Sequence, residues 1–132
     1  MSHRSVIEHV YVRLAENDFQ PIFDILSPDA QWIEAENIPY SPGKPLVGHD
    51  AVQTAVFDRL PKDFADFHIN VTHISAGETT VLVEGRYVGT TKTGKDLDAI
   101  FAHVWEFGGD RIVRFQQYSD TWQWRRVLDV NH

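Results

Sequence analysis

The feature that most constrains this chain is a pair of apolar runs joined by Gly108-Gly109-Asp110. The runs cover residues 97–107 and 111–119, and glycine-rich joints of this length are typical of β-hairpins. The second run is followed by Asp120-Thr121-Trp122-Gln123, a pattern that resembles a capping box. We therefore expect a long hairpin that leads directly into a short helix through residue 128.

His103 lies in the first apolar run, on the strand face that also carries Phe101, Trp105 and Phe107. An apolar wall lowers the pKa of an imidazole and leaves a neutral ring that can accept or donate a proton. The same pattern fits a buried core histidine, and Asp120 fits a helix cap as well as a carboxylate in a cleft. Both readings stay open from the residues alone.

The register of this hairpin decides whether His103 and Asp120 face the same cavity. A three-residue loop over residues 108–110 turns Asp120 away from His103, unless the second strand bulges near Gln116-Gln117. A two-residue loop would bring the two side chains together, but it would also place Arg114 on that face. The longer loop with a bulge is the expected form.

Hydrophobic periodicity divides the rest of the chain into helices followed by strands. Helical spacing predicts helices over residues 5–14, 18–26 and 49–60, the first opened by the Ser5-Val6-Ile7-Glu8 capping box and the third ended by Pro61. Period-two alternation predicts strands over residues 30–36, 68–75, 80–90, 97–107 and 111–119. Three prolines and two glycines predict a loop over residues 37–48.

Helices at the start and a meander at the end predict an α+β fold. We expect a single domain over residues 1–132, in which a cone-shaped, curved, mostly antiparallel sheet wraps around three N-terminal helices. The short helix at the C-terminus completes the fold. The space between the sheet and the helices is a natural cleft.

The bulk composition narrows the classes of partner. A formal net charge of −7 makes nucleic acid and anionic membranes unsuitable partners. The absence of cysteine excludes thiolate catalysis and fits a reducing compartment, and the first ten residues have no apolar core of signal-peptide length, so we expect a cytoplasmic protein. Eight phenylalanines, four tyrosines and four tryptophans suffice to line a pocket or an interface as well as a core.

Glu34 alternates with Trp32 on the first predicted strand, so the two side chains share a face. If that face lines the cleft, desolvation raises the pKa of the carboxyl group and makes it a usable base. A half-exposed position at the strand surface is the alternative. Tyr40, in the proline-rich loop, either closes over a ligand or packs in the core.

No pattern in the sequence indicates a metal or a cofactor. His68 and His73 lie five residues apart on a predicted strand, so their side chains point to opposite faces. The chain has no phosphate-binding glycine loop, no Gly-x-Ser-x-Gly elbow and no dinucleotide fingerprint. We expect neither a bound metal nor a cofactor.

Three strings and their order resemble the SnoaL-like polyketide cyclase group of the ketosteroid isomerase-like (nuclear transport factor 2-like) superfamily. The strings are LSPDAQWIEAENIPY, VGHDAV and FAHVWEFGGDRIVRFQQYSDTW. The resemblance implies that Glu34 occupies the place of a general-base aspartate, that His103 replaces an oxyanion-stabilising acid, and that Asp120 is similar to a cyclase aspartate. The family's helix-one tyrosine falls near Val10, one residue from Tyr11. An arginine–aspartate pair typical of epoxide hydrolases is replaced by Phe101 and His103, which argues against that activity.

The resemblance implies acid–base chemistry of an isomerase, cyclase or hydrolase type on a small apolar carbonyl or hydroxyl compound. His103 and Asp120 are the expected proton-handling pair, with Glu34 as a further base. The expected ligand-binding walls are Trp32, Tyr40, Phe101, Trp105, Tyr118 and Tyr11. The alternative is a ligand-binding or interaction module without turnover.

The resemblance also implies a homodimer formed through the outer face of the sheet. The expected contact surface consists of Val81, Val83, Tyr87 and Val104.

Overall fold

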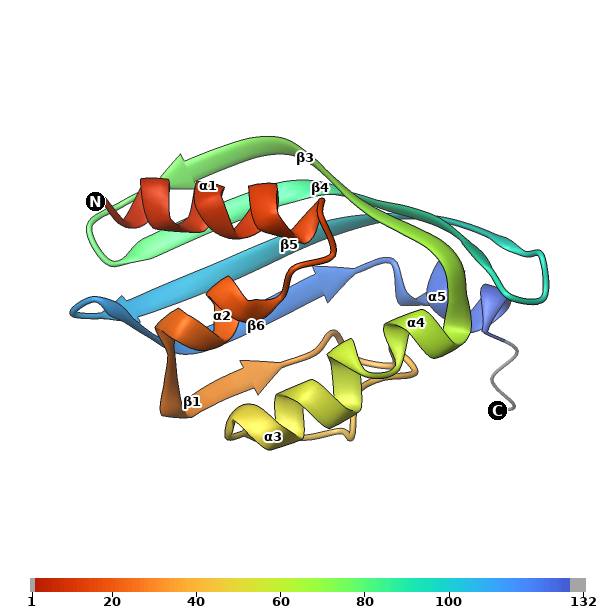
Figure 1. Ribbon diagram of the computed structural model, residues 1–132, viewed down its shortest axis with the longest axis horizontal. Coiled ribbons are helices and arrows are strands. Elements are labelled where there is room, and N and C mark those ends of the chain that lie inside the picture. The colour runs from red at the N-terminus through yellow and green to blue at the C-terminus, as the bar shows by residue number, and fades with distance from the viewer. Residues whose placement is uncertain (1, 129–132) are drawn as a thin grey trace.

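The computed structural model describes residues 2–128 and confirms the expected α+β fold, with helices packed against a curved six-stranded sheet (Figure 1). The strand order is β2-β1-β6-β5-β4-β3. The strands are β1 (Leu26–Ile33), β2 (Leu46–Val47), β3 (Phe64–Ala76), β4 (Thr80–Thr91), β5 (Asp96–Gly108) and β6 (Arg111–Ser119). The helices are α1 (His3–Leu14), α2 (Gln20–Ile25), α3 (His49–Val52), the π-helix η1 (Gln53–Phe57), α4 (Leu60–Asp63) and α5 (Thr121–Val127).

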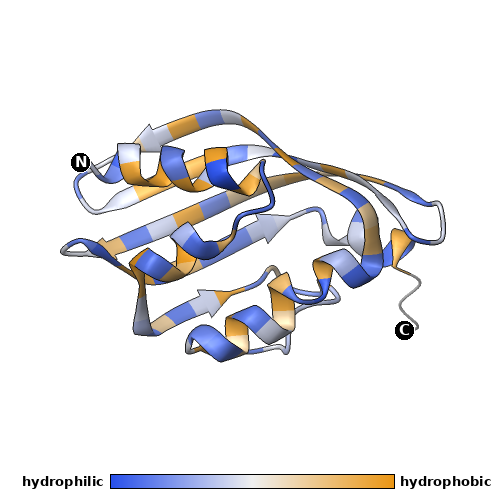
Figure 2. Cartoon of the chain, viewed as in Figure 1, coloured by the Kyte–Doolittle hydropathy of each residue, from blue (hydrophilic) through white to orange (hydrophobic). Residues whose placement is uncertain are grey.

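The strands β3 to β6 form an antiparallel meander, and β1 joins it in parallel beside β6. Hydrophobic and hydrophilic residues alternate along the long strands (Figure 2), because successive side chains point to opposite faces of the sheet. The inward face of β5 buries Phe101, His103, Trp105 and Phe107 together, as their spacing predicts. No helix among the described residues is long and apolar enough to span a bilayer.

The turn between β5 and β6 differs from the expected three-residue loop. Gly108 pairs with Arg111, so the turn contains only Gly109 and Asp110, and Gly109 has a φ of +65°. The bulge lies beside this turn, between the pairs formed by Glu106 and Phe107, and not near Gln116-Gln117 as expected. It restores the register in which Arg114 faces outward, so its guanidinium group pairs with Glu106 at 3.3 Å and stays out of the core.

Two helix boundaries also correct the sequence prediction. Ser2, and not Ser5, caps α1: its hydroxyl group accepts a hydrogen bond from the backbone N–H of Ser5 at 3.1 Å. The predicted helix over 49–60 is divided into α3, η1 and α4, and Pro61 lies in the first turn of α4. Proline is tolerated there because the first backbone N–H groups of a helix have no intrahelical acceptor.

The surface expected to form a dimer interface is largely core. Val81 and Val83 are fully buried and Tyr87 is 4% exposed, because Val83 pairs with His103 and therefore shares its inward face. Of the four expected interface residues, only Val104 lies on the outer face, opposite Leu82 and Gln116. The homodimer itself stays a prediction.

The N-terminal end of α1 is held against the turns at one end of the sheet. The His3 ring stacks on Phe107 with 3.9 Å between centroids, and its two ring nitrogens lie 2.8 and 2.9 Å from the carbonyl oxygens of Glu78 and Gly109. Arg4 donates to the carbonyl oxygen of Ile74 at 2.9 Å. These contacts fix the helix over β3 to β5, with Ile7, Val10 and Tyr11 facing the core.

Gly85, on the inward face of β4, sets the position of the Phe101 ring. A Cβ atom at residue 85 would lie 2.2 Å from the carbonyl oxygen of Asn70 and 2.8 Å from the Phe101 ring. Phe101 in turn stacks on His103, with 4.2 Å between ring centroids. The absence of a side chain at this position therefore lets β3 and β4 approach each other and supports the aromatic stack beneath His103.

We expect Gly85→Ala to lower the free energy of unfolding by about 3 kcal/mol, because both the backbone of β3 and the Phe101 ring must move. Gly77→Ala is the matched control, since the nearest atom to a Cβ there is 3.7 Å away. Urea denaturation of both variants measures the difference. Equal stabilities would contradict this account of the packing.

Candidate active site

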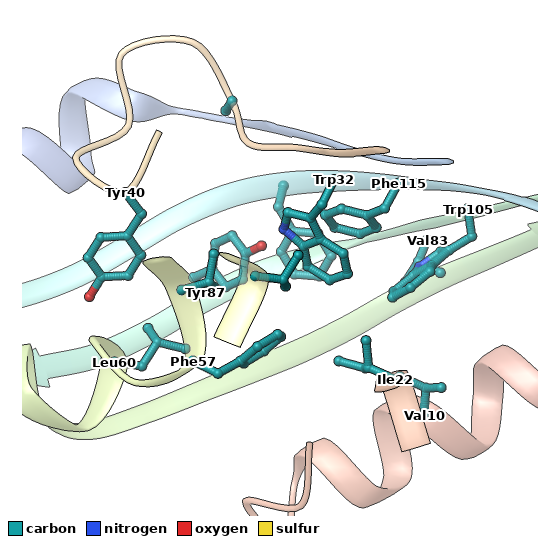
Figure 3. Close-up of a cluster of buried hydrophobic side chains, with 14 of the residues drawn as sticks. Val10, Ile22, Trp32, Tyr40, Phe57, Leu60, Val83, Tyr87, Trp105 and Phe115 are labelled. Carbon is teal, nitrogen blue, oxygen red and sulfur yellow. The ribbon is translucent and has the colours of Figure 1, made fainter. Parts of the chain in front are cut away.

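The sheet and the helices enclose an inner cavity of about 50 Å³. Its walls are aromatic, and Figure 3 shows Trp32, Phe115, Trp105 and Tyr87 gathered on the strands, with Phe57 and Leu60 on the segment that faces them. The polar groups that reach the cavity are Tyr11, Glu34, Tyr40, Tyr87, His103 and Gln117. A few polar groups in an apolar enclosure are the usual composition of a small-molecule site.

His103 lies between two tyrosine hydroxyl groups. Its Nδ1 atom is hydrogen-bonded to the hydroxyl group of Tyr11 on α1, and its Nε2 atom to that of Tyr87 on β4. Each hydroxyl oxygen also accepts a further bond, in Tyr11 from the Trp105 indole at 3.0 Å and in Tyr87 from the Gln117 amide at 2.7 Å. One histidine thus connects α1 with three neighbouring strands.

Burial lowers the pKa of His103 from 6.5 to about 3, so the ring is neutral at physiological pH. A neutral imidazole donates through one nitrogen and accepts through the other. Burial also raises the pKa values of Tyr11 and Tyr87, so both hydroxyl groups keep their protons.

The network of His103, Tyr11 and Tyr87 has one hydrogen more than its internal hydrogen bonds use. The two hydroxyl groups and the neutral imidazole carry three hydrogens, whereas only two hydrogen bonds join them. In either tautomer of His103, one tyrosine therefore accepts from the ring and keeps its own O–H hydrogen unused within the network. Both tyrosines line the cavity, so a ligand oxygen bound there is a candidate acceptor for that hydrogen.

Glu34 follows the end of β1 and is 5% exposed. Burial raises the pKa of its carboxyl group from 4.5 to about 7, and the hydrogen bond from the Trp32 indole, 3.2 Å long, opposes part of that rise. The Glu34 charge in turn adds to the raised pKa of Tyr87. A buried carboxyl group of this kind is half ionised near neutral pH and can take up a proton.

Gln117 links Tyr87 to the backbone beside Glu34. Its amide nitrogen donates to Tyr87, and its amide oxygen accepts from the backbone N–H of Ala35 at 3.2 Å. On the other side of Glu34, Ile33 pairs with Gln116 in the parallel ladder between β1 and β6. The backbone is therefore fixed on both sides of Glu34.

Tyr40 and Trp124 close one end of the cavity. The Tyr40 hydroxyl group donates to Asp63 at 2.7 Å, and the guanidinium group of Arg59 lies 4.3 Å from the centre of its ring. Burial, followed by the hydrogen bond to Asp63, raises the pKa of Tyr40. Trp124 of α5 packs edge-on against Tyr40 and Tyr87.

The structure brings together most of the residues that the sequence singles out. Lining the cavity are Glu34, His103, Trp32, Tyr40, Trp105 and Tyr11. Phe101 is buried behind His103 and is not part of the wall.

Asp120 and Tyr118 lie outside the cavity. Asp120 is exposed at the start of α5, and its side chain makes no capping hydrogen bond, so the predicted capping box is wrong. Tyr118 pairs with Ala102 on the outer face and is 56% exposed. Both positions follow from the register of β6, which turns Gln117 inward instead.

Two residues of the network, Tyr87 and Gln117, are absent from the sequence-based set of site residues. The sequence pattern predicts an outer interface position for Tyr87 and only a bulge at Gln117. The signal that could have placed Tyr87 is the Lys92-Thr93-Gly94 joint: a three-residue turn there sets Val83 opposite His103, as observed.

Within residues 2–128, no three His, Asp or Glu side chains gather closely enough to hold a metal ion. The acceptor and donor groups of the cavity suit a neutral oxygen-bearing ligand. A carboxylate and one spare hydroxyl hydrogen can together move a proton and bind an oxygen atom.

The family of the chain follows from comparison with known proteins. The profile of the SnoaL-like domain matches residues 7–115, which is most of the chain. This protein belongs to the SnoaL-like domain family.

Solved structures agree with that fold. An NTF2-like protein of unknown function from Burkholderia pseudomallei is 24% identical, with a TM-score of 0.87 over 98% of this chain and 100% of that one. TerC, crystallised with polyporic acid, is 19% identical, with a TM-score of 0.82 over 96% and 97% of the two chains. A candidate SnoaL-like polyketide cyclase from Jannaschia sp. is 11% identical, with a TM-score of 0.78 over 97% and 92%.

One curated relative, cytochrome P450 71D95 from Mentha spicata, is 33% identical over 116 residues. The match covers 76% of this chain and spans only 23% of the length of that relative.

We expect the His103 ring to stay neutral down to about pH 4, with no titration of its side-chain NMR signals between pH 5 and 8. Because its pKa in the fold is below the unfolded value of 6.5, its contribution to stability is complete above pH 6.5 and is lost as the pH falls toward 3. The variant His103→Gln, which keeps a donor and an acceptor, should lose less stability over that range. A ring that titrates near pH 6.5 would refute the buried network.

Proposed function

We propose that this protein binds a small, largely apolar carbonyl compound and moves a proton on it, as an isomerase or cyclase does. Glu34 is the general base, and a tyrosine hydroxyl group held by His103 donates a hydrogen bond to the carbonyl oxygen. The observation that carries the proposal is that a buried carboxyl group and an unused hydroxyl hydrogen reach the same cavity. The SnoaL-like family, which includes cyclases and isomerases, supports this class of reaction.

The proposed reaction requires only the Glu34 carboxylate and the tyrosine hydroxyl group. The Glu34 carboxylate takes a proton from the carbon next to the carbonyl group, and the electrons of that C–H bond form an enolate. The tyrosine hydroxyl group stabilises the negative charge that develops on the oxygen. Returning the proton to another carbon gives an isomer. Alternatively, the enolate carbon attacks a second carbonyl group of the same molecule and closes a ring, and the alkoxide formed there takes the proton back from Glu34.

The surroundings of Glu34 suit a base at neutral pH. Its pKa of about 7 lies near the operating pH, where general bases are most effective. The cavity walls exclude water around the carboxylate, which strengthens its interaction with a developing charge. The neutral ring of His103 brings no charge to the site, so it does not stabilise the enolate electrostatically. Its part in the reaction is to position Tyr11 and Tyr87.

A binding module without turnover is the second candidate. It is favoured by the complete pairing of buried side-chain polar atoms within the described part of the chain, as expected of a structural network. In that case the cavity binds the ligand, and Glu34 contributes a hydrogen bond only.

Exchange of the α-protons of 2-butanone for deuterium, followed by NMR in D₂O, tests the proposal. We expect kcat/KM to rise with pH up to about 7 and then to level off, since only the carboxylate form of Glu34 accepts a proton. Glu34→Gln should lower the rate by about 10²–10⁴-fold, whereas the exposed neighbour variant Glu36→Gln should not. Binding of 2-butanone without exchange in the wild type would favour the binding module.

Glu34→Gln, which should lower the rate of exchange, should raise the stability of the fold at high pH. The pKa of Glu34 is raised on folding, so its neutral form is favoured in the fold, and stability falls as the pH rises from 4.5 toward 7. The rise of the Glu34 pKa from 4.5 to about 7 corresponds to about 3 kcal/mol in the free energy of unfolding. We expect Glu34→Gln to be more stable than the wild type at pH 8 and similar at pH 4.5, as measured by urea denaturation. A loss of stability at pH 8 would show that the carboxylate is not desolvated.

The double variant Tyr11→Phe/Tyr87→Phe removes both hydroxyl groups next to His103. We expect it to lower the rate of α-proton exchange by about 10²–10³-fold, the usual effect of removing an oxyanion donor. Tyr118→Phe makes the same chemical change at an exposed hydroxyl group and should leave the rate unchanged. Equal rates in the three proteins would exclude the tyrosines as oxyanion donors.

A further inference from the structure

The inner cavity is too small to hold a whole ligand of ordinary size. Its volume of about 50 Å³ is well below the roughly 300–1,000 Å³ of typical ligand pockets. It can hold a carbonyl group and a few attached atoms. Any larger substrate must therefore extend beyond this cavity while its reacting end stays beside Glu34.

A second hollow, here called the outer groove, adjoins the inner cavity and has a volume of about 530 Å³. It lies between the end of α1, the η1–α4 segment and the first half of β3. Five residues line both hollows, so their side chains form the partition between them: Leu14, Phe57, Leu60, Phe67 and Ile69. All five are apolar, and none of them can hold a polar part of a ligand by hydrogen bonding.

The partition is carried in part by an irregular helical segment. Phe57 ends the π-helix η1, and Leu60 begins α4 three residues later. Figure 3 shows both side chains directed toward the strands that carry Tyr87 and Trp32. Phe57 is 7% exposed and Leu60 is 8% exposed, so both side chains are packed into the partition that separates the groove from the cavity.

Polarity changes along the path from the cavity to the far end of the groove. The cavity holds the carboxyl, hydroxyl and imidazole groups, and the partition is apolar. The groove then has a mixed border, in which the exposed side chains of Asp66 and His68 lie 2.6 Å apart beside Asn70. An elongated molecule with an oxygen at one end and a flexible apolar chain matches this order.

We infer that the outer groove is a subsite for the apolar chain of an elongated carbonyl compound whose head lies in the inner cavity. The inference rests on the proposed function for the position of the carbonyl head. It adds a substrate class, chain-bearing ketones, and a surface that selects them by length. The residues that face the chain are Ala15, Phe19, Phe57, Leu60, Ala65 and Phe67.

A series of 2-alkanones from 2-butanone to 2-octanone tests this inference by binding alone. Dissociation constants are measured by NMR shift titration of the backbone amides of the whole chain. Each buried methylene group contributes about fourfold in affinity, so we expect the wild type to bind 2-octanone about two hundred times more tightly than 2-butanone.

Ala65→Trp fills the groove from β3, and Ala15→Trp fills it from the end of α1, so two variants test the same volume from opposite walls. In both we expect 2-butanone to bind as in the wild type and the gain with chain length to disappear. Ala76→Trp places the same side chain at an exposed position of β3 outside the groove and should keep the full gain.

Affinity that does not rise with chain length in the wild type overturns the inference, and so does an unchanged gain in both groove variants. A wild type that binds none of the ketones overturns it as well. Glu34→Gln separates the two proposals, because it should keep the chain-length gain while losing α-proton exchange. A chain-length gain that the groove variants abolish, in a wild type without exchange, would refute the proposed reaction and support the subsite.

Discussion

The fold depends on keeping one imidazole neutral between two hydroxyl groups in an apolar interior. An unpaired buried polar group costs several kilocalories per mole, so each nitrogen of His103 needs a partner, and the partners come from α1 and β4. Trp105 and Gln117 then complete the bonds of those partners. The position of α1 over the sheet is therefore set by polar geometry as well as by apolar packing. His3 and Arg4 fix the other end of the same helix.

Glu34 differs from His103, because its surroundings leave the charged form of the carboxyl group poorly stabilised. A single indole hydrogen bond is the only direct support that the described residues give its carboxyl group. A protein selected for stability alone would gain from a neutral side chain at this position. Retaining a carboxylate there is understandable if its raised pKa is useful, and the unused tyrosine hydrogen in the same cavity gives that carboxylate a chemical partner.

Much of the fold could be predicted from the sequence because period-two alternation and short glycine turns are local signals. The predicted bounds of β4, β5 and β6 agree with the structure to within a residue, and the sequence singles out Glu34 and His103 as candidates for the cavity face, where both lie. The register of β6 against β5 could not be predicted in the same way. The bulge beside the β5–β6 turn, where Val113 has no paired residue on β5, breaks no local rule. It keeps Arg114 beside Glu106 on the outer face, and this contact is not visible in the local sequence pattern. The sequence prediction for Asp120 and Tyr118 is wrong for that reason, and Gln117 escapes prediction because its role depends on contacts with Ala35 and with Tyr87 of β4.

If the two hollows bind the head and the chain of one ligand, as proposed, the accepted chain can vary without a change in the polar centre. The centre needs His103, two tyrosines and Gln117 in a fixed frame, and this frame is built from central strands and α1. The outer groove is bordered by the end of α1 and by the irregular η1–α4 segment, whose packing is not tied to that hydrogen-bond network. In the proposed subsite, substitutions on that segment would change the length or shape of the accepted chain at little cost to the network. The polar centre and the proposed chain subsite thus lie in different parts of the fold: the first on the central strands and Tyr11 of α1, the second between the end of α1, the η1–α4 segment and β3.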